Sequence, residues 1–125
     1  MKHIYLKILK IFRNESILLI EKELTYDYGQ FEELNISYFK MREQGILPRI
    51  FVSTDIKNNF KNFVILHELG HFLNYKMNIL DTENSANLSM LKIIKNNLPY
   101  WYRFILMYYL FKYTDINPFK ILYIK

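Results

Sequence analysis

Residues 63–73, FVILHELGHFL, decide the fold of this chain. They place two of its three histidines, His67 and His71, four residues apart in a largely apolar segment. On a helix, residues i and i+4 lie one turn apart on the same face, so both imidazoles can reach one metal ion. Glu68 is offset from His67 by about 100° around the helix, so its carboxylate can lie beside the metal without ligating it.

This spacing of two histidines and a glutamate predicts hydrolytic chemistry. Zinc lowers the pKa of a water that it binds toward ~7, and a neighbouring carboxylate can take the proton as the water attacks a carbonyl. The same carboxylate can pass that proton to a leaving amine. The alternative is a pair of core or surface histidines without a metal. The apolar flanks argue against it, because two unpaired histidines on a largely buried helix are costly.

Few residues of the chain are candidates for a third metal ligand. A catalytic zinc site has three protein ligands and one open position. The chain has no cysteine, and the third histidine, His3, is remote in sequence. Only Asp81, Glu83 and Asp115 follow His71 among the acids. Glu83 is favoured because it opens the next predicted helix, although a first-turn acid is also stabilised by the helix dipole alone. Asp81 is the alternative ligand, or a partner that orients a ligand imidazole.

The pattern of apolar residues predicts helices over residues 2–13, 56–76, 83–96 and 100–113. Thr54 or Asp55 is expected to cap the second of these helices, and Thr82 the third. Residues 36–41 and 49–54 are rich in β-formers and are separated by a segment with Gly and Pro, which predicts two strands joined by a turn. Residues 17–20 fit a strand or a helix start, and residues 25–34 read as a loop.

Length and composition predict one domain spanning residues 1–125. Half of the chain is hydrophobic (51%) and 23% is charged, which excludes wholesale disorder. The longest uncharged apolar run near the C-terminus, residues 104–111, is far shorter than the ~20 residues that span a bilayer. No cleavage site follows the lysine-interrupted N-terminus, so we expect a cytoplasmic protein without a membrane span.

The segment 98–125 is basic and aromatic. The whole net charge of +5 lies in residues 84–125, and segment 98–125 holds ten of the 22 aromatic residues. These aromatics can close the core of the same domain, or they can form a homodimer or substrate interface. Aromatics interleaved with basic residues can also stack on bases. Nucleic acid is the less favoured partner, because strong binders carry denser Lys/Arg clusters.

Residues 54–87 carry motifs that resemble those of a known family. A strand at 50–52 precedes a helix with His67-Glu68-Leu69-Gly70-His71, and the following helix begins Glu83-Asn84-Ser85-Ala86-Asn87. This order is similar to the core of the ImmA/IrrE-type zinc metallopeptidases of phages and mobile elements. The resemblance implies that His67, His71 and Glu83 ligate Zn²⁺ and that Glu68 is the general base and acid. It also implies a protein substrate, a helix-turn-helix repressor of a phage or integrative element.

Together these patterns predict a small α+β, zincin-like domain. A short antiparallel sheet is expected to pack on the motif helix, with further helices around it. The expected function is a zinc-dependent endopeptidase that cleaves a regulatory protein. Two alternatives stay open: a non-catalytic, metal-containing protein that inactivates a partner by binding, and a small interaction or nucleic-acid-binding protein that uses segment 98–125.

Two smaller expectations concern the site. A metallopeptidase needs a group that stabilises the oxyanion, and the sequence offers Tyr75, Tyr100 or Tyr102 for this task without choosing among them. Gly70 lies inside the predicted motif helix, where glycine costs about 1 kcal/mol relative to alanine. Its presence predicts the close approach of another backbone near the metal or a tight contact between helices.

Overall fold

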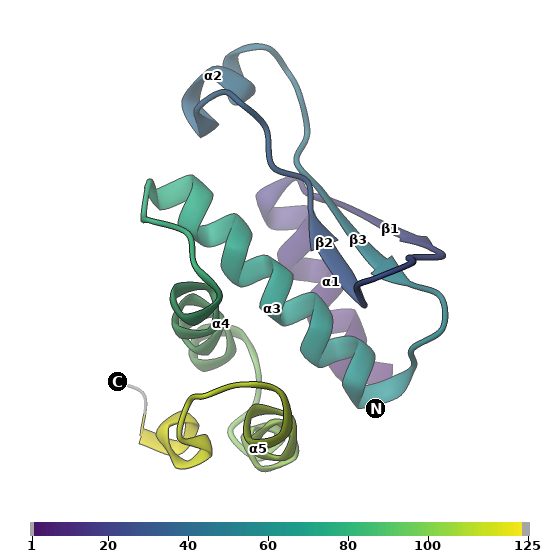
Figure 1. Cartoon of the computed structure of the whole chain (residues 1–125), viewed down its shortest axis with the longest axis vertical. Coiled ribbons are helices and arrows are strands. Elements are labelled where there is room, and N and C mark those ends of the chain that lie inside the picture. Colours follow the sequence, from purple (N-terminus) through teal and green to yellow (C-terminus); the bar gives the residue numbers. More distant parts are fainter. Residues whose placement is uncertain (1, 124–125) are drawn as a thin grey trace.

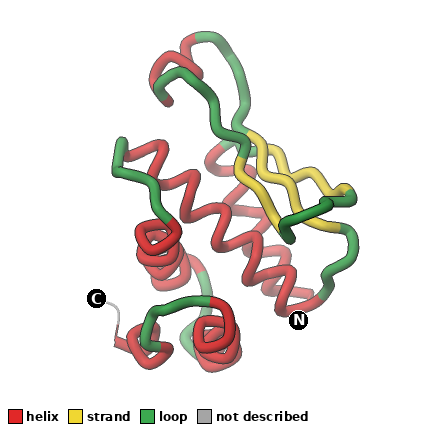
Figure 2. Tube along the Cα trace, in the orientation of Figure 1, coloured by secondary structure: helices red, strands yellow, loops and turns green. Residues whose placement is uncertain are grey.

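A computed structural model describes residues 2–123, and it combines a small sheet with five α-helices in that part of the chain (Figures 1 and 2). Residues 124–125, the end of the segment 98–125, lie outside the described residues. The α+β class predicted from the sequence is confirmed. The elements in chain order are α1 (Lys2–Glu15), β1 (Leu18–Lys22), β2 (Gly29–Phe31), α2 (Tyr38–Glu43), β3 (Arg49–Ser53), α3 (Asn58–Met77), α4 (Glu83–Asn97), α5 (Tyr102–Tyr113) and the 3₁₀ helix η1 (Pro118–Tyr123).

The sheet has the strand order β1-β3-β2, and it is mixed rather than antiparallel. β1 pairs with β3 in parallel, and β2 pairs with β3 antiparallel. The predicted pairing of residues 36–41 with 49–54 is wrong, because residues 38–43 form α2. Ser37 starts this helix, since its Oγ accepts the backbone N–H of Lys40 at 3.2 Å. The third strand, β2, comes instead from the segment that was expected to be a loop.

One face of the sheet packs against α1 and α3, which lie on the same side of it (Figure 1). Ile50 and Val52, two residues apart on β3, are fully buried on this face. Phe51 lies between them and points to the other face, where Lys22 and Arg49 cover its ring. The sheet therefore has a helix-covered face and an outer face. α3 runs along the covered side and packs against α4 on another side, and the face of α3 between the sheet and α4 is left free.

The N-cap residue of α3 differs from the expected one, whereas the N-cap residue of α4 is the expected one. The N-cap of α3 is Lys57, so the predicted caps Thr54 and Asp55 are wrong. The N-cap of α4 is Thr82, as predicted: its Oγ1 accepts the backbone N–H of Ser85 at 3.0 Å, and the Ser85 hydroxyl accepts the backbone N–H of Thr82 at 2.8 Å. This reciprocal capping box fixes the first turn of α4 beside the turn that ends α3.

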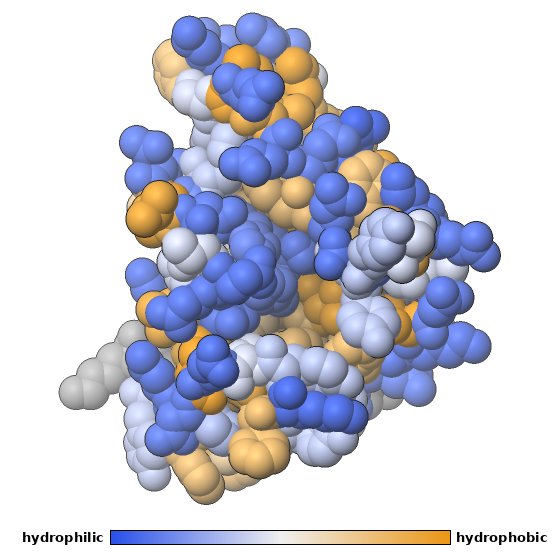
Figure 3. Space-filling view, in the orientation of Figure 1, coloured by the Kyte–Doolittle hydropathy of each residue, from blue (hydrophilic) through white to orange (hydrophobic). Residues whose placement is uncertain are grey.

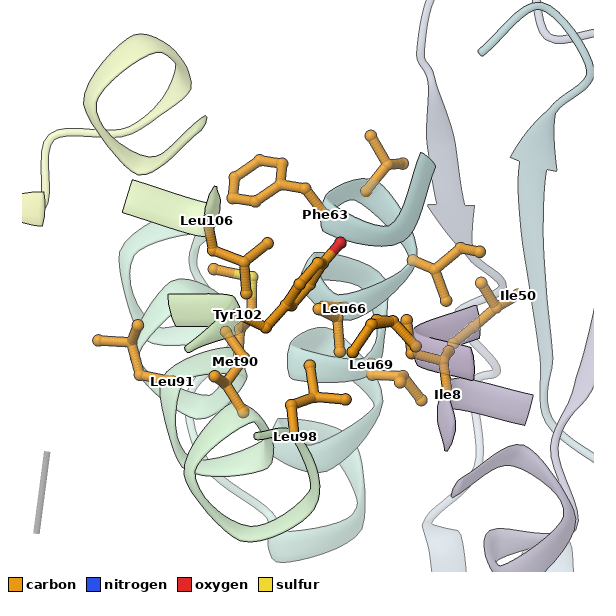
Figure 4. Packing of buried hydrophobic residues seen from close by; sticks show 14 of the residues in the cluster. Ile8, Ile50, Phe63, Leu66, Leu69, Met90, Leu91, Leu98, Tyr102 and Leu106 are labelled. Atoms are coloured by element: carbon orange, nitrogen blue, oxygen red, sulfur yellow. The ribbon is translucent and has the colours of Figure 1, made fainter. Parts of the chain in front are cut away.

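The C-terminal helices complete the core around α3. Tyr102 is fully buried between α3, α4 and the start of α5 (Figure 4), and its hydroxyl donates to Asn59 and accepts from Asn62. Other residues of the segment 98–125 are buried with it: Leu98, Arg103, Leu106, Leu110, Ile116 and Ile121. Among the ten aromatic residues of the segment, only Tyr102 is buried and eight are exposed, so the expectation that these aromatics close the core is wrong for most of them. Among residues 2–123 no helix combines the length and the apolar character that crossing a membrane requires.

Candidate metal centre

His67 and His71 lie on the free face of α3 and bring two imidazole nitrogens together. Their rings are perpendicular with centroids 4.8 Å apart, and their Nε2 atoms are 3.2 Å apart. The local sequence explains this orientation, because Leu66, Leu69 and Phe72 bury the opposite face of the helix in the core. The two histidines are left at the floor of an open face, where both remain partly exposed.

The outer nitrogen of each imidazole is held by an acceptor. His67 Nδ1 lies 2.7 Å from Asn87 Oδ1, and His71 Nδ1 lies 2.8 and 2.9 Å from the carboxylate oxygens of Asp81. Because an amide oxygen and a carboxylate only accept hydrogen bonds, these contacts favour a proton on both Nδ1 atoms. In a neutral imidazole this leaves the lone pair on Nε2, which is the tautomer that a metal ligand needs, and both Nε2 atoms face the same point.

Glu83, the first residue of α4, supplies the third group at that point. Its carboxylate oxygens lie 2.9 Å from His67 Nε2 and 3.3 Å from His71 Nε2. With neutral imidazoles, two Nε2 lone pairs and a carboxylate that meet in this way repel one another, and a bound cation removes that repulsion. Ligands at 2.0–2.1 Å in a tetrahedral zinc site are separated by about 3.3 Å. The three separations found here, 2.9, 3.2 and 3.3 Å, fit such an ion.

Glu68 is the buried carboxylate of the centre, only 6% exposed. His67, Glu68 and His71 can each offer a ligand atom within 4.8 Å of the others, so this group could hold a metal ion. The Glu83 carboxylate lies 2.9 and 3.3 Å from the two Nε2 atoms, which is closer than this 4.8 Å separation. Glu68 therefore lies beside the point where the other three groups converge. Burial raises the pKa of Glu68 to about 7; nearby His67 lowers it, Glu83 raises it, and a hydrogen bond from the backbone N–H of Phe31 lowers it.

Asp81 lies behind His71 rather than at the point of convergence. Its carboxylate accepts from His71 Nδ1 and also from Asn74 Nδ2 at 2.9 Å. Asn74 is fully buried; its Nδ2 also donates to Ser85 at 3.0 Å, and its Oδ1 accepts the hydroxyl of Ser89. The sequence left two roles open for Asp81, an alternative metal ligand or a partner that orients an imidazole. Its position behind His71 corresponds to the orienting partner.

Asn74 and Asn87 were not predicted as site residues. Asn87 belongs to the same Glu83–Asn87 motif that gave the third ligand, so its position in that motif was the available signal. Asn74 is three residues after His71 on α3, where the sequence alone gives no reason to single out a polar residue. Only the packing of α3 against α4 shows that its amide joins the Asp81 carboxylate to the first turns of α4.

Gly70 explains how α4 comes close enough for Glu83 to reach the histidines. A Cβ atom at position 70 would lie 2.1 Å from the carbonyl oxygen of Ala86 and 3.1 Å from the backbone nitrogen of Met90. The sequence offered two expectations for Gly70, the approach of another backbone and a tight contact between helices. They describe the same contact, because the backbone that approaches Gly70 is that of α4. Ala86, fully buried, is the small residue on the other side of this contact.

The centre opens into a cleft of about 950 Å³ that runs along α3. One wall comes from residues 27–31, which include β2, and the other from residues 81–84 at the start of α4 and residues 112–115 at the end of α5. The space-filling view is hollowed in front of α3, with hydrophobic atoms deep in the hollow between β2 and α5 (Figure 3). The cleft can admit a chain-like ligand to the point where His67, His71 and Glu83 meet.

The three tyrosines expected near the oxyanion are elsewhere. Tyr75 donates its hydroxyl to the carbonyl of Ile36, Tyr100 donates to the carbonyl of Leu122, and Tyr102 is in the core. None of the three lines the cleft, so this expectation is wrong. The tyrosines that do line it are Tyr28, before β2, and Tyr113, at the end of α5.

The chain matches no protein-family model, no curated protein and no solved structure. A functional proposal therefore depends on the motif residues and on the geometry that brings them together.

Proposed function

We propose that this chain is a zinc-dependent endopeptidase with a zincin-like domain, in which His67, His71 and Glu83 bind Zn²⁺ and Glu68 is the general base and acid. One observation carries the proposal. Two imidazole Nε2 atoms and a carboxylate converge within 2.9–3.3 Å of one another, next to a buried carboxylate, on the floor of an open cleft.

The donor set favours zinc over other ions. Two imidazole nitrogens and one carboxylate oxygen suit Zn²⁺, whereas Mg²⁺ and Ca²⁺ prefer oxygen ligands alone. Three protein ligands that face a cleft leave a position open for substrate, as catalytic zinc sites do. Zinc bound there supplies a Lewis acid that acidifies water and polarises the carbonyl of a substrate. Asp81 and Asn87 hold the two imidazoles in the ligating tautomer before any ion arrives.

Glu68 has the placement that proton transfer requires. Its carboxylate lies beside the histidines, and the backbone N–H of Phe31 donates a hydrogen bond to it, which orients the group toward the cleft. A carboxylate in this position takes a proton from the attacking water and then gives it to the nitrogen of the leaving amine. The proton is thus held on Glu68 between the two steps, and the buried setting keeps bulk water from removing it.

The cleft suits an extended peptide. β2 is an edge strand of the sheet, and Tyr28 and Glu32 on either side of it make their backbone bonds to β3. Because these bonds alternate along an antiparallel pair, the backbone N–H and C=O groups of Gly29 and Phe31 point away from β3. The Phe31 N–H is taken by Glu68, which leaves its C=O and both groups of Gly29 for a ligand. A peptide chain can add to such an edge through its main chain and so present one carbonyl to the metal centre.

The substrate class follows from the resemblance to the ImmA/IrrE-type metallopeptidases, which points to a regulatory protein of the helix-turn-helix repressor type. The test compares wild-type protein, Glu68→Gln and Glu33→Gln on purified helix-turn-helix repressors, including any that is found encoded beside the gene, with cleavage read by mass spectrometry. Glu33 lines the cleft away from the metal ligands and serves as the matched carboxylate control.

We expect wild type and Glu33→Gln to cleave, and Glu68→Gln to keep zinc while its rate falls by about 10²- to 10⁴-fold. Equal cleavage by Glu68→Gln contradicts the proposed role of Glu68. Inactivation of the repressor by wild type and Glu68→Gln alike, without any cut, contradicts the peptidase and favours the non-catalytic binder.

A further inference from the structure

The cleft along α3 is chemically uneven on the two sides of the metal centre. Beyond His71 its walls are polar and acidic, with Glu33, Asp81 and Thr82. On the other side of His67, toward the beginning of α3, the lining residues are Val64, Phe63 and Phe60. A peptide lying in the cleft therefore meets a polar surface on one side of its scissile bond and an apolar one on the other.

Five aromatic side chains from three parts of the fold build the apolar end. Phe60 of α3 packs edge-on against Tyr28, with ring centroids 5.1 Å apart, and lies 4.9 Å from the ring of Tyr113 at the end of α5. Below them, Phe63 is buried and stacks on Tyr109 at 5.6 Å. The lower pair belongs to the core, whereas Tyr28 and Tyr113 are 55% and 46% exposed and line the cleft. Aromatic surface is therefore open to a ligand at this end.

The position of this apolar end sets which residue of a peptide would reach it. Val64 and Phe63 precede His67 by three and four residues, which is about 5 Å along the helix, and Phe60 precedes it by seven residues, about 10 Å. An extended peptide advances about 3.3 Å per residue. A side chain over the Val64–Phe60 surface therefore belongs to a residue one to three positions from the carbonyl that faces the metal centre.

We propose that this aromatic end of the cleft, closed by Phe60, Tyr28 and Tyr113, is a specificity pocket for a large apolar side chain within three residues of the bond that is hydrolysed. The inference rests on the proposed peptidase function and adds the preferred sequence of its substrate. It also gives the C-terminal segment a role in the site, because α5 reaches the cleft through Lys112 and Tyr113, and Tyr113 is the aromatic residue of the two.

The test uses the zinc-loaded full-length chain and a mixture of peptides with all residue types around a central bond. Cleavage products are read by mass spectrometry for wild type, Tyr113→Ala, Tyr113→Phe and Phe111→Ala. Phe111 is the matched control, because it lies two residues away on the same helix, is 75% exposed and does not line the cleft. Thermal unfolding of each variant shows that it is folded.

We expect wild type to prefer Phe, Tyr, Leu or Met over Ala or Ser at one position within three residues of the cut by at least tenfold. Tyr113→Ala should reduce that ratio below threefold, while Tyr113→Phe and Phe111→Ala retain it. A wild-type profile without an apolar preference overturns the pocket whatever the variants do, and so does an unchanged ratio in Tyr113→Ala.

Failure of the proposed function gives a different result. If zinc-loaded wild type cuts no peptide, the same library is bound to zinc-loaded Glu68→Gln and the retained peptides are sequenced. Enrichment of large apolar residues that is lost in Glu68→Gln/Tyr113→Ala supports the pocket although hydrolysis has failed. Retention of peptides without that enrichment, or no retention at all, overturns the pocket as well.

Discussion

Gly70→Ala tests whether the close packing of α3 on α4 creates the metal centre. The added methyl would lie 2.1 Å from the Ala86 carbonyl oxygen and 3.0 Å from its carbon. An ordinary C···O contact is about 3.3 Å, so the two helices must separate by about 1 Å. All the atoms in the way are backbone atoms, so no side chain can rotate to relieve the overlap.

Two effects of this substitution oppose each other. Alanine favours the interior of a helix over glycine by about 1 kcal/mol. Overpacking of a buried contact costs about 1–3 kcal/mol or more, and the backbone overlap places Gly70 at the upper end of that range. We therefore expect a net loss of about 2 kcal/mol in the free energy of unfolding, which lowers the melting temperature by about 8 °C.

The same separation should weaken zinc binding. It draws the Glu83 carboxylate away from His67 and His71, whose Nε2 atoms it now approaches to 2.9 and 3.3 Å. We expect at least a tenfold loss of zinc affinity, measured by competition with a chromophoric chelator. In a Glu83→Ala background, Gly70→Ala should cause little further loss, because the coupled ligand is already absent.

A higher melting temperature for Gly70→Ala in the presence of EDTA, together with unchanged zinc affinity, would refute this reasoning. That result would mean that helix propensity alone governs position 70 and that α4 need not lie so close to α3.

Further predictions concern the groups around the ligands. Asn87→Ala removes the acceptor of the His67 Nδ1 proton and should weaken zinc binding by about 10- to 100-fold in the same chelator competition. Chelator-treated protein should lose stability as the pH rises from about 5 to 7, because burial raises the pKa of Glu68 from 4.5 to about 7 and the unfolded chain releases this proton first. The loss should reach about 3 kcal/mol by pH 8, measured by urea unfolding, and Glu68→Gln should remove it.

Two outcomes would contradict these predictions. Unchanged zinc affinity in Asn87→Ala would mean that the hydrogen bond to His67 does not orient its imidazole. A chelator-treated wild type whose stability rises or stays constant between pH 5 and 8, or a Glu68→Gln variant with the same slope as wild type, would mean that Glu68 is not desolvated in the folded chain.

The helices and the central motif could be predicted from local patterns. The apolar repeat of residues 56–76 gives α3 almost to its ends, and the Thr82 cap gives the start of α4. The position of Glu83 beside the histidines followed from the same logic, because a short connection folds α4 back on α3. These features depend on residues that are close in sequence, where periodicity and capping preferences act directly.

The strands of the sheet could not be predicted from local patterns, because they are set by contacts between residues that are far apart in sequence. Residues 36–41 carry β-formers, but the Ser37 cap and the neighbouring tertiary contacts make residues 38–43 a helix. β2 has only Gly29, Gln30 and Phe31, and it is a strand because it pairs with β3. Gly29 is required there, since a Cβ atom would lie 2.6 Å from Val64 Cγ1 of α3. This need arises only when the sheet and the helix meet.

The outer ring of the site was missed for a related reason. Asn74 of α3 joins the site because α4 packs on α3, and Tyr113 of α5 joins it because α5 packs on α3. Each contact links two different elements of the fold. A tyrosine or an asparagine on a helix gives no spacing signal comparable to that of two histidines four residues apart. The candidate ligands could thus be named individually from the sequence, while the residues that contact them or line the cleft required the folded chain.

The zinc content of the purified chain tests the central claim most directly. Protein purified without added metal and passed through gel filtration is analysed for zinc per chain, with Glu68→Gln and Glu83→Ala beside wild type. We predict close to one equivalent in wild type and in Glu68→Gln, and less than half an equivalent in Glu83→Ala. Less than half an equivalent in wild type, not restored by added zinc, would contradict the claim that His67, His71 and Glu83 form a zinc centre.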